Sequence, residues 1–422
     1  MRFLYTLLIY LAAPLFVLRL FWKSRLNPAY RGRWQERFGF FSDDGQQSTI
    51  WIHAVSVGET QATQQLVSHL QERFPDQRLV ISTTTPTGAE RVKALYGDSV
   101  SHYYFPYDLP GVLKRWIRHI NPKLLIMMET EVWPNLLFRC RESHIPSVLA
   151  NARLSEKSCK GYEKLGKFTE QVFGLIDLVA AQGESDAMRF KKMGVNHDRV
   201  QVTGSVKFDI HQKAFVREQA EAIRRLIGIG RPVWIAASTR EGEEEAVLEA
   251  HQQILESLPE ALLVLVPRHP ERFDKVAQLC EQQGLGVVRR TENRACEGHH
   301  KVFLGDSMGE LALMYQLADV AFVGGSLVDT GGQNILEPAS FGLPVLFGPS
   351  MYNFADISEM LLKQQAARSV KDADMLAKTT IELLQDASQR ALLGENGRRV
   401  IAQNQGASKR LVEFIFSRIS LN

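Results

Sequence analysis

Short apolar runs alternate with polar loops along the first half of the chain. The first run, 50–55, ends in Ser56-Val57-Gly58-Glu59, and a helical pattern of apolar positions follows over 60–74. Similar runs, each followed by a polar loop, lie at 79–82, 124–128, 148–150, 178–180 and 200–202. Strands buried on both faces of a parallel sheet have continuous apolar sequences of this kind. The pattern therefore predicts an α/β domain with a parallel sheet and crossover helices.

The same pattern starts again after a polar helix predicted at 211–226 and a break rich in glycine and proline at 228–232. Its apolar runs lie at 233–236, 262–266, 287–288, 302–304, 320–323 and 345–347, and helical spacing follows over 373–419. A chain of 422 residues is also too long for one hydrophobic core. We predict two α/β sheets that face each other across a cleft. The expected segments are an N-terminal anchor over 1–25, a first domain over 26–212 and a second domain over 213–422.

The N-terminal segment is apolar and is followed by positive charge. Residues 3–18 carry no charge, and a helix over 1–22 reaches about 33 Å, enough for a hydrocarbon core of about 30 Å. The basic residues that follow, opposed by Glu36, are Arg19, Lys23, Arg25, Arg31, Arg33 and Arg37. This bias predicts a membrane anchor with the downstream domains on the cytoplasmic side, against anionic lipid. A cleavable signal peptide is disfavoured because no small-residue cleavage site follows. A spanning helix and an interfacial helix both remain open.

Net charge and cysteine content bear on the binding partners and on the redox state of the compartment. The formal net charge of +3 is too small to indicate nucleic acid as a partner. The four cysteines, Cys140, Cys159, Cys280 and Cys296, form no C-x-x-C pair and no metal-ligand pattern. They are typical of a reducing compartment.

Glu59 is the first candidate for chemistry. It follows a predicted buried strand and lies near the start of the next helix, where the helix dipole favours a carboxylate. Open α/β sheets bind ligands outside the carboxyl ends of their strands, so this side chain is expected at the mouth of a cleft. Gly58 allows the backbone to turn closely beside it. A purely structural role as a first-turn helix acid remains an equal alternative.

Other polar side chains of the first half also follow predicted strands. Glu129 and Glu131 leave one strand and Lys207 leaves another, although charged residues at such an edge are commonly just solvated. His53 is expected within a strand as a packing histidine. Ser56 has no recognisable His/Asp set, so a hydrolase triad is unsupported.

In the second half, glycines precede a predicted helix at Gly331-Gly332-Gln333-Asn334. Backbone N–H groups in such a loop are able to approach an anion, and an acid in the following helix, here Glu337, is able to bind ribose hydroxyls. A capped glycine turn is the structural alternative. Arg268, beside two prolines, suits a phosphate or a carboxylate, with a surface ion pair as the alternative. The turn 308–310 is, by itself, most simply an ordinary strand–helix turn.

Ten motifs in order give the chain a family resemblance. They are HAVSVGET, TTTPTGAERV, PYDLP, METEVWPN, NARLS, TGSVKFD, PRHPERF, GDSMGEL, FVGGSLV and GGQNILEP. Together they resemble the 3-deoxy-D-manno-oct-2-ulosonic acid (Kdo) transferases of lipopolysaccharide synthesis, over nearly the whole chain. The resemblance implies a glycosyltransferase B fold with two facing Rossmann-like domains. It also implies transfer of Kdo from CMP-Kdo to the lipid A precursor at the cytoplasmic face of the inner membrane.

The resemblance also implies roles for individual residues. Glu59 matches the family's proton acceptor, and Glu129 and Lys207 match positions that stabilise the transition state. The positions that match contacts to CMP are Pro267, Arg268, Met308, Gly309, Glu310, Asn334, Ile335, Leu336 and Glu337. Gln333 stands where other members often carry histidine. CMP-Kdo is a substrate, so no cofactor is expected.

The implied chemistry is an inverting, single-displacement transfer without a metal, because the leaving group is a monophosphate. A carboxylate takes the proton of the sugar hydroxyl, and cationic groups stabilise the departing phosphate. Three alternatives remain open. They are a membrane-associated glycosyltransferase of the same fold that uses a UDP-sugar, a membrane-tethered nucleotide-binding module without activity, and a sugar-nucleotide epimerase.

Overall fold

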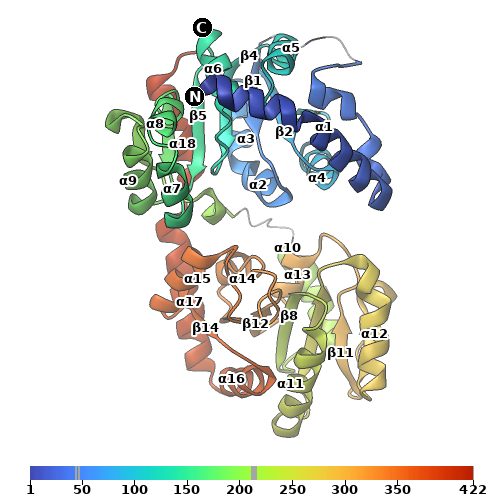
Figure 1. The fold of residues 1–422 in the computed structure, drawn as a ribbon. Coiled ribbons are helices and arrows are strands. Elements are labelled where there is room, and N and C mark those ends of the chain that lie inside the picture. The colour runs from blue at the N-terminus through green and yellow to red at the C-terminus, as the bar shows by residue number, and fades with distance from the viewer. Residues whose placement is uncertain (43–44, 46–47, 211–215, 422) are drawn as a thin grey trace. The chain divides into compact units, whose positions relative to one another are not determined.

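The computed structural model describes residues 1–422 except 43, 44, 46, 47, 211–215 and 422 (Figure 1). The chain forms two compact units: unit 1 is Met1–Asp209 with Gln405–Asn422, and unit 2 is Ile210–Asn404. The boundary expected between 212 and 213 lies outside the described residues. The last helix, α18 (Ala407–Arg418), belongs to unit 1, whereas the sequence pattern placed all of 213–422 in the second domain.

Unit 1 is built on a parallel sheet whose order, among the described residues, is β3-β2-β1-β4-β5-β6-β7. The strands are β1 (Thr49–His53), β2 (Arg78–Thr83), β3 (Ser101–Tyr104), β4 (Pro122–Met128), β5 (Ser147–Ala152), β6 (Leu178–Ala181) and β7 (Val200–Val202). Its other helices are α1 (Arg2–Leu26), α2 (Val57–Ala62), α3 (Gln64–Arg73), α4 (Pro86–Tyr96), α5 (Pro110–Ile120), α6 (Pro134–Glu142), α7 (Glu156–Glu163), α8 (Lys167–Phe173) and α9 (Glu184–Lys192). The predicted parallel sheet is confirmed, and the pattern missed the short edge strand β3.

Unit 2 repeats this design with the order β10-β11-β9-β8-β12-β13-β14 in the part of the chain that is described. The strands are β8 (Val233–Thr239), β9 (Leu262–Pro267), β10 (Gly286–Arg289), β11 (His300–Leu304), β12 (Val320–Val323), β13 (Val345–Phe347) and β14 (Ala367–Ser369). Its helices are α10 (Val216–Ile227), α11 (Glu244–Ser257), α12 (Phe273–Gln282), α13 (Leu311–Tyr315), α14 (Leu336–Phe341), α15 (Ala355–Lys363), α16 (Ala373–Gln385) and α17 (Ala387–Asn404).

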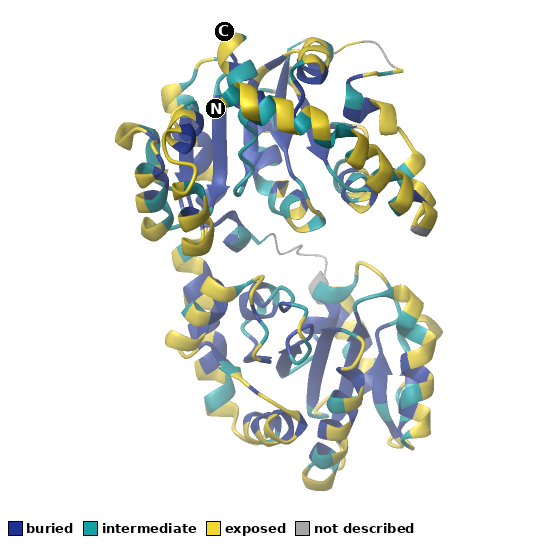
Figure 2. Ribbon diagram, viewed as in Figure 1, coloured by how far each residue is buried: buried dark blue, intermediate teal, exposed yellow. Residues whose placement is uncertain are grey.

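The central strands are buried on both faces, as their apolar sequences require (Figure 2). On one face of the first sheet, the rings of Trp51 and Trp116 lie 4.2 Å apart between centroids. On the other face, α18 contributes Leu411 and Ile415 to the core beside Ile50 of β1. Burial of these apolar side chains places α18 in unit 1, a long-range contact that local periodicity does not reveal.

In each sheet the strand order reverses beside the first strand, between β1 and β4 in unit 1 and between β8 and β12 in unit 2, and in unit 2 β11 also lies between β9 and β10. Ligands of open α/β sheets bind outside the carboxyl ends of the strands at such a point. The loops after β1, β4, β8 and β12 are therefore the places where a site is expected.

Candidate functional site

Glu59 lies in the first turn of α2, directly after β1. Ser56 is the N-cap, and its Oγ accepts from the Glu59 backbone N–H at 3.3 Å. The Glu59 carboxylate in turn accepts from the Val55 N–H at 2.8 Å and from the Ser56 hydroxyl at 3.0 Å. This reciprocal arrangement is close to a capping box, so the structural alternative describes a real role of this side chain. Two bonds do not saturate a carboxylate, which offers about four lone-pair sites.

The environment of Glu59 favours its protonated form. Burial raises the pKa of this carboxyl to about 7, and the negative charges of Glu129 and Glu131 add to the effect. The donors Val55 and Ser56 oppose the increase in pKa. A general base works best with a pKa near the operating pH, so Glu59 is suited to accept a proton near neutrality.

Glu129 and Lys207 form an ion pair in unit 1. Glu129 follows β4 with a φ of 57°, and its carboxylate lies 3.2 Å from the Lys207 Nζ. Lys207 belongs to a short 3₁₀ helix, Val206–Phe208, which comes after β7. Asn151 of β5, buried and also left-handed (φ 52°), supports that helix by accepting from the Val206 N–H at 3.1 Å. Glu129 therefore links the two other candidates, because its charge acts on Glu59 and its carboxylate pairs with Lys207.

His53 and Glu131 add a second polar pair beside these residues. His53 is fully buried and stacked on Phe105 at 3.7 Å between ring centroids. Trp51 Nε1 donates to Ser82 Oγ, which lies 3.0 Å from His53 Nδ1. His53 Nε2 has no hydrogen-bond partner among the described residues and lies 3.8 Å from the Glu131 carboxylate. The expected packing histidine is thus confirmed in its burial, but its free nitrogen faces a candidate-site glutamate.

In unit 2, Glu243 organises the loop that follows β12. Its fully buried carboxylate accepts backbone N–H bonds from Arg240, Gly325, Ser326 and Leu327, at 2.5–2.9 Å. The sequence pattern does not single out Glu243, because this residue stands among several glutamates that open a helix. The feature of the sequence that points to Glu243 is the distant FVGGSLV motif at 322–328. The N–H groups of this loop need an acceptor, and a buried carboxylate supplies one.

The glycine loop 331–333 folds onto that same segment. Gly332 N–H donates to the Gly325 carbonyl at 2.7 Å, Gln333 N–H to the Gly324 carbonyl at 3.2 Å, and Gly331 N–H to Ser350 Oγ at 3.2 Å. Gly331 and Gly332 have φ values of 86° and 73°, which glycine adopts without strain. The expectation that these glycine N–H groups point at an anion is therefore wrong in this conformation, because they close the loop.

Glu337 of α14 has the features of a binding acid. Burial raises its pKa to about 7, and no hydrogen bond from the described residues reaches its carboxylate. The neighbouring Asn334 caps the Leu336 N–H at 3.0 Å. Because α14 is six residues long, its dipole is a smaller source of anion affinity than the sequence argument assumed.

The other predicted contacts of unit 2 lie at the same edge of its sheet. Arg268 follows β9, and its N–H donates to the Thr239 carbonyl at 3.0 Å. Met308 is exposed, and Gly309 is left-handed with a φ of 84°. Glu310 is engaged internally, with Arg290 at 3.1 Å and with Ser307. Pro267 ends β9, and Ile335 lies buried before α14.

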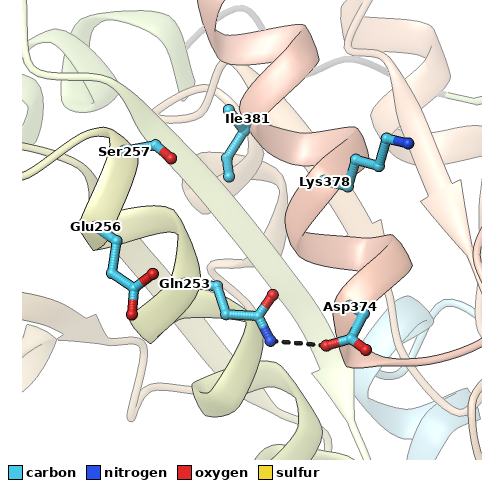
Figure 3. A pocket seen from close by; sticks show the side chains of 6 residues that line it. All are labelled: Gln253, Glu256, Ser257, Asp374, Lys378 and Ile381. Atoms are coloured by element: carbon cyan, nitrogen blue, oxygen red, sulfur yellow. Dashed lines mark hydrogen bonds between the residues drawn. The ribbon is translucent and has the colours of Figure 1, made fainter.

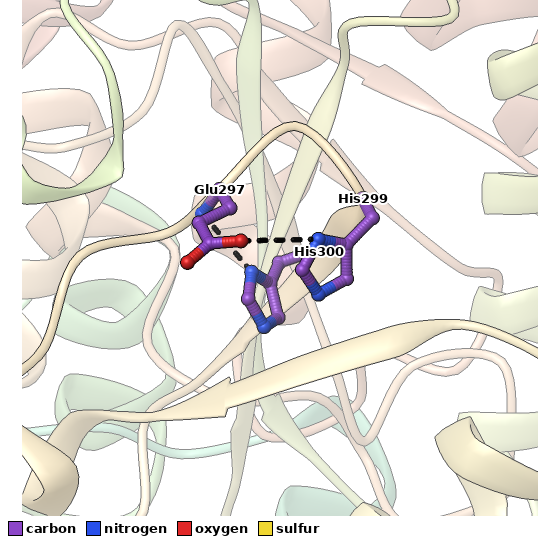
Figure 4. Close-up of side chains that lie close together, drawn as sticks. All are labelled: Glu297, His299 and His300. Atoms are coloured by element: carbon purple, nitrogen blue, oxygen red, sulfur yellow. Dashed lines mark hydrogen bonds and ion pairs between the residues drawn. The ribbon is translucent and has the colours of Figure 1, made fainter.

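Three other features do not belong to this site. A shallow pocket between α11 and α16 is lined by Gln253, Glu256, Ser257, Asp374, Lys378 and Ile381 (Figure 3). Glu297, His299 and His300 lie close together (Figure 4), but His300 Nδ1 accepts from the Glu297 N–H and its Nε2 lies 3.2 Å from the Arg294 guanidinium, which opposes a cation. The sequence Asp372-Ala373-Asp374 has the D-x-D form of some metal-binding transferases, but Asp372 is the N-cap of α16 and accepts from the Met375 N–H.

Comparison with known proteins gives matches over both units. Residues 32–210 match the family model for 3-deoxy-D-manno-octulosonic-acid transferase, and residues 242–400 match glycosyl transferases group 1. A 3-deoxy-D-manno-octulosonic acid transferase of Haemophilus influenzae is 42% identical, covering 98% of each chain. One of Bordetella pertussis is 35% identical, also covering 98% of each chain.

Solved structures provide a comparison of fold. A UDP-GlcNAc 2-epimerase of Neisseria meningitidis superposes with a TM-score of 0.59, covering 88% of this chain and 100% of that one. At 13% sequence identity, this likeness concerns the fold alone.

Proposed function

The chain belongs to the 3-deoxy-D-manno-octulosonic acid transferase family, and we propose that it transfers Kdo from CMP-Kdo to the lipid A precursor (lipid IVA) in lipopolysaccharide biosynthesis. It is a glycosyltransferase. Its two α/β units, each built on a parallel sheet, form the glycosyltransferase B fold that was expected. The observation that supports the proposed mechanism is the placement of Glu59, a partly buried carboxyl with a pKa of about 7, at the strand-order reversal of unit 1.

The proposed reaction is a metal-independent, inverting single displacement. A hydroxyl oxygen of the acceptor attacks the anomeric carbon of Kdo while the bond from that carbon to the phosphate oxygen of CMP breaks. The hydroxyl proton goes to Glu59, and the bonding electron pair leaves with CMP. Attack from the face opposite the leaving group inverts the anomeric configuration. Because Val55 and Ser56 already hold the carboxylate, Glu59 needs no rearrangement before it accepts the proton.

Lys207 and Glu129 have complementary tasks in this proposal. The Lys207 ammonium provides positive charge for the Kdo carboxylate or for the charge that develops in the transition state. Glu129, 3.2 Å away, holds that ammonium in position and raises the basicity of Glu59 through its own charge. Both effects require Glu129 to be ionised while the acceptor hydroxyl reacts.

Unit 2 is the proposed donor-binding unit. The Glu337 carboxylate, without a hydrogen bond from the described residues, is a suitable acceptor for the two ribose hydroxyls of CMP. Arg268 supplies positive charge at the end of β9 for the phosphate. The backbone of 308–310 and 334–336 is proposed to supply further contacts; directly before 334, the N–H groups of Gly332 and Gln333 are held by the carbonyls of Gly325 and Gly324, a segment that Glu243 binds.

The direct test is product mass. Purified protein is incubated with CMP-Kdo and tetra-acylated lipid A precursor, and the lipid is weighed by mass spectrometry. We expect a mass increase by whole Kdo residues, and no product with a UDP-sugar in place of CMP-Kdo. CMP at 100 times its Kd should stabilise the fold by about 2.7 kcal/mol, while UDP should not. A shift with UDP alone would replace this proposal with a UDP-sugar transferase.

The Glu59→Gln variant tests the mechanism separately. Loss of a general base typically costs about 10² to 10⁴ in rate, so turnover should fall by that factor while CMP-induced stabilisation is retained. Near-normal turnover in this variant would remove Glu59 from the reaction and leave it as a helix cap.

The proposed location is the inner membrane, with both units on the cytoplasmic side. Within the described residues, α1 is the helix that is long and apolar enough to cross a membrane. The basic residues that follow it suit an anionic cytoplasmic leaflet. An amphiphilic acceptor explains the need for such an anchor, because it keeps the reaction beside its substrate.

A further inference from the structure

Helix α1 has two different faces. One side of the helix is exposed along its length (Figure 2), and most of the residues on it are large and apolar, recurring at steps of three or four. They are Phe3, Leu4, Leu7, Leu8, Leu11, Leu15, Leu18, Phe21 and Trp22. Large exposed apolar surfaces of this kind mark a contact with a membrane or another protein.

The opposite face of α1 is fixed to unit 1 by polar contacts near the N-terminus. Arg2 pairs with Glu142 of α6 at 2.8 Å. Tyr5 donates to the carboxylate of Asp108 at 2.8 Å, and Thr6 donates to the Asn135 side chain at 2.9 Å. Asp108 and Asn135 are buried, so the contacts of Tyr5 and Thr6 are part of the folded unit, whereas Arg2 and Glu142 form a surface pair.

Contacts continue to the other end of the helix. Phe16 stacks on Tyr107 at 5.2 Å between ring centroids, and Ser24 is buried near the C-terminal end. Arg31 beyond the helix lies 3.4 Å from Ser24 Oγ. A helix of 25 residues is about 37 Å long; its N-terminal part and its middle contact α6 and the loop before α5, and its C-terminal end packs against the segment 28–31 that follows it.

We propose that α1 lies in the plane of the membrane surface, docked along unit 1, with its N-terminus on the same side as the catalytic units. This inference rests on the proposed membrane location. A spanning orientation would carry Arg2 across the hydrocarbon core, and it would separate Tyr5 and Thr6 from their buried partners. An in-plane helix keeps every one of these contacts and buries its apolar face in lipid.

Charge identifies the occupant of the exposed face as an anionic bilayer rather than a second copy of the chain. Arg19, Arg25, Arg31 and Arg33 are exposed around the C-terminal end of α1. Anionic lipid headgroups complement these charges, whereas an antiparallel contact between two copies would leave them without partners. Trp22 is suited to the headgroup boundary.

The docked helix also connects the lipid surface with the reactive residues. Asp108 accepts the N–H groups of Asn135 and Leu136, which begin α6. The loop that enters α6 carries Glu129 and Glu131, and Trp133 at its end donates to Glu131 at 2.8 Å. An in-plane α1 therefore holds the candidate acceptor side of unit 1 at the membrane surface, where a lipid-linked hydroxyl is presented.

The test locates the N-terminus of the full chain. An epitope is placed before Met1, and protease is added to intact spheroplasts and to inverted inner-membrane vesicles. We expect the epitope to be removed in inverted vesicles and protected in spheroplasts. Removal in spheroplasts would overturn the in-plane arrangement and leave the transferase proposal intact. A chain absent from the membrane fraction would overturn both this inference and the proposed location.

Variants test the lipid-facing surface without unfolding the protein. Leu11→Glu with Leu15→Glu should weaken binding to phosphatidylethanolamine–phosphatidylglycerol vesicles by more than about tenfold. Leu392→Glu on α17, a leucine that is 54% exposed against 67% and 64% for Leu11 and Leu15, is the control and should bind like the unmodified chain. Unchanged vesicle binding by the double variant would overturn the proposal. It would also be overturned if neither the unmodified chain nor the variant bound vesicles and the double substitution converted a dimer into a monomer.

Discussion

The pKa of Glu59 gives a quantitative prediction about pH and rate. A shift from 4.5 to about 7 corresponds to roughly 3 kcal/mol of preference for the protonated form in the folded protein. If the ionised form accepts the proton, the rate follows the ionised fraction, which is about 9% at pH 6 and about 91% at pH 8. We therefore expect kcat/KM for CMP-Kdo to rise about tenfold between these two pH values.

The perturbation that tests the cause of this shift is Glu129→Gln. Burial is the largest contribution, and the charge of Glu129 is the next. Removal of that charge should lower the pKa of Glu59, move the acidic limb of the profile to lower pH, and bring the ratio of rates at pH 8 and pH 6 toward one. Glu131→Gln is the control, because Glu131 is the smaller contributor and should move the limb less.

The assay is the initial rate of CMP release between pH 5 and 9, with the donor varied at a fixed acceptor concentration. The absolute rate of Glu129→Gln is expected to fall, so the position of the limb is the informative quantity. An acidic limb that stays in place in Glu129→Gln, or that persists in Glu59→Gln, would refute the assignment of Glu59 as the titrating base.

The same shift has a consequence for stability. Because the folded-state pKa of this acid lies above its unfolded value, the folded protein binds the proton more tightly between pH 4.5 and about 7. The free energy of unfolding therefore decreases as pH rises through this window. The neutral Glu59→Gln side chain removes this dependence, so the variant should lose less stability than the unmodified chain between pH 5 and pH 8 in urea titrations.

Three further changes follow from the structure. Lys207→Ala should reduce kcat by at least about tenfold with CMP binding retained, since the ammonium acts on developing charge; unchanged kinetics would make it a surface lysine. Glu243→Gln should abolish the thermal shift caused by CMP, because an amide has one oxygen for four N–H donors. The exposed neighbour Glu245 is the control, and Glu245→Gln should keep that shift. A shift retained in both variants would show that the loop keeps its conformation without the Glu243 carboxylate. Glu129→Gly should be more stable than Glu129→Ala by about 1 kcal/mol in urea unfolding, because glycine accepts a φ of 57° without strain, and equal stabilities would contradict a strained backbone.

Local pattern predicted the central part of the fold well and its periphery poorly. Strands such as β4, in which Leu124 to Met128 are fully buried, have continuous apolar sequences, and such sequences are typical of central strands in a parallel sheet. The edge strands β3 and β14 read SHYY and ARS, and pairing with a neighbour, rather than their own hydrophobicity, makes them strands. Helix α18 has ordinary amphipathic spacing, so nothing local indicates that it returns to the first unit.

For the candidate site, the sequence predicted where the polar side chains lie but not which hydrogen bonds they and the loops make. Position after a strand predicted that Glu59, Glu129 and Lys207 lie at the edge of one sheet, because strand ends of a parallel sheet coincide. Position did not predict which backbone donors are already used. The N–H groups of Gly331 and Gly332 close their own loop, and Glu243 satisfies those beyond β12, which depends on contacts between residues more than 80 positions apart.

Left-handed backbone recurs where these strands end, and this has a common physical reason. Glu129, Asn151 and Ser238 all have φ values of 52–59°, a conformation that costs most non-glycine residues about 1–2 kcal/mol and asparagine less. The left-handed backbone at Glu129 accompanies the approach of its carboxylate to Lys207. Asn151 accepts a hydrogen bond from the Val206 N–H, in the short helix that carries this lysine. Glycine at either position would relax the backbone but would remove a side chain that the arrangement needs. The strain is therefore the structural cost of bringing the two charges together, and it explains why carboxylate and amide side chains occupy turns where glycine would fold more easily.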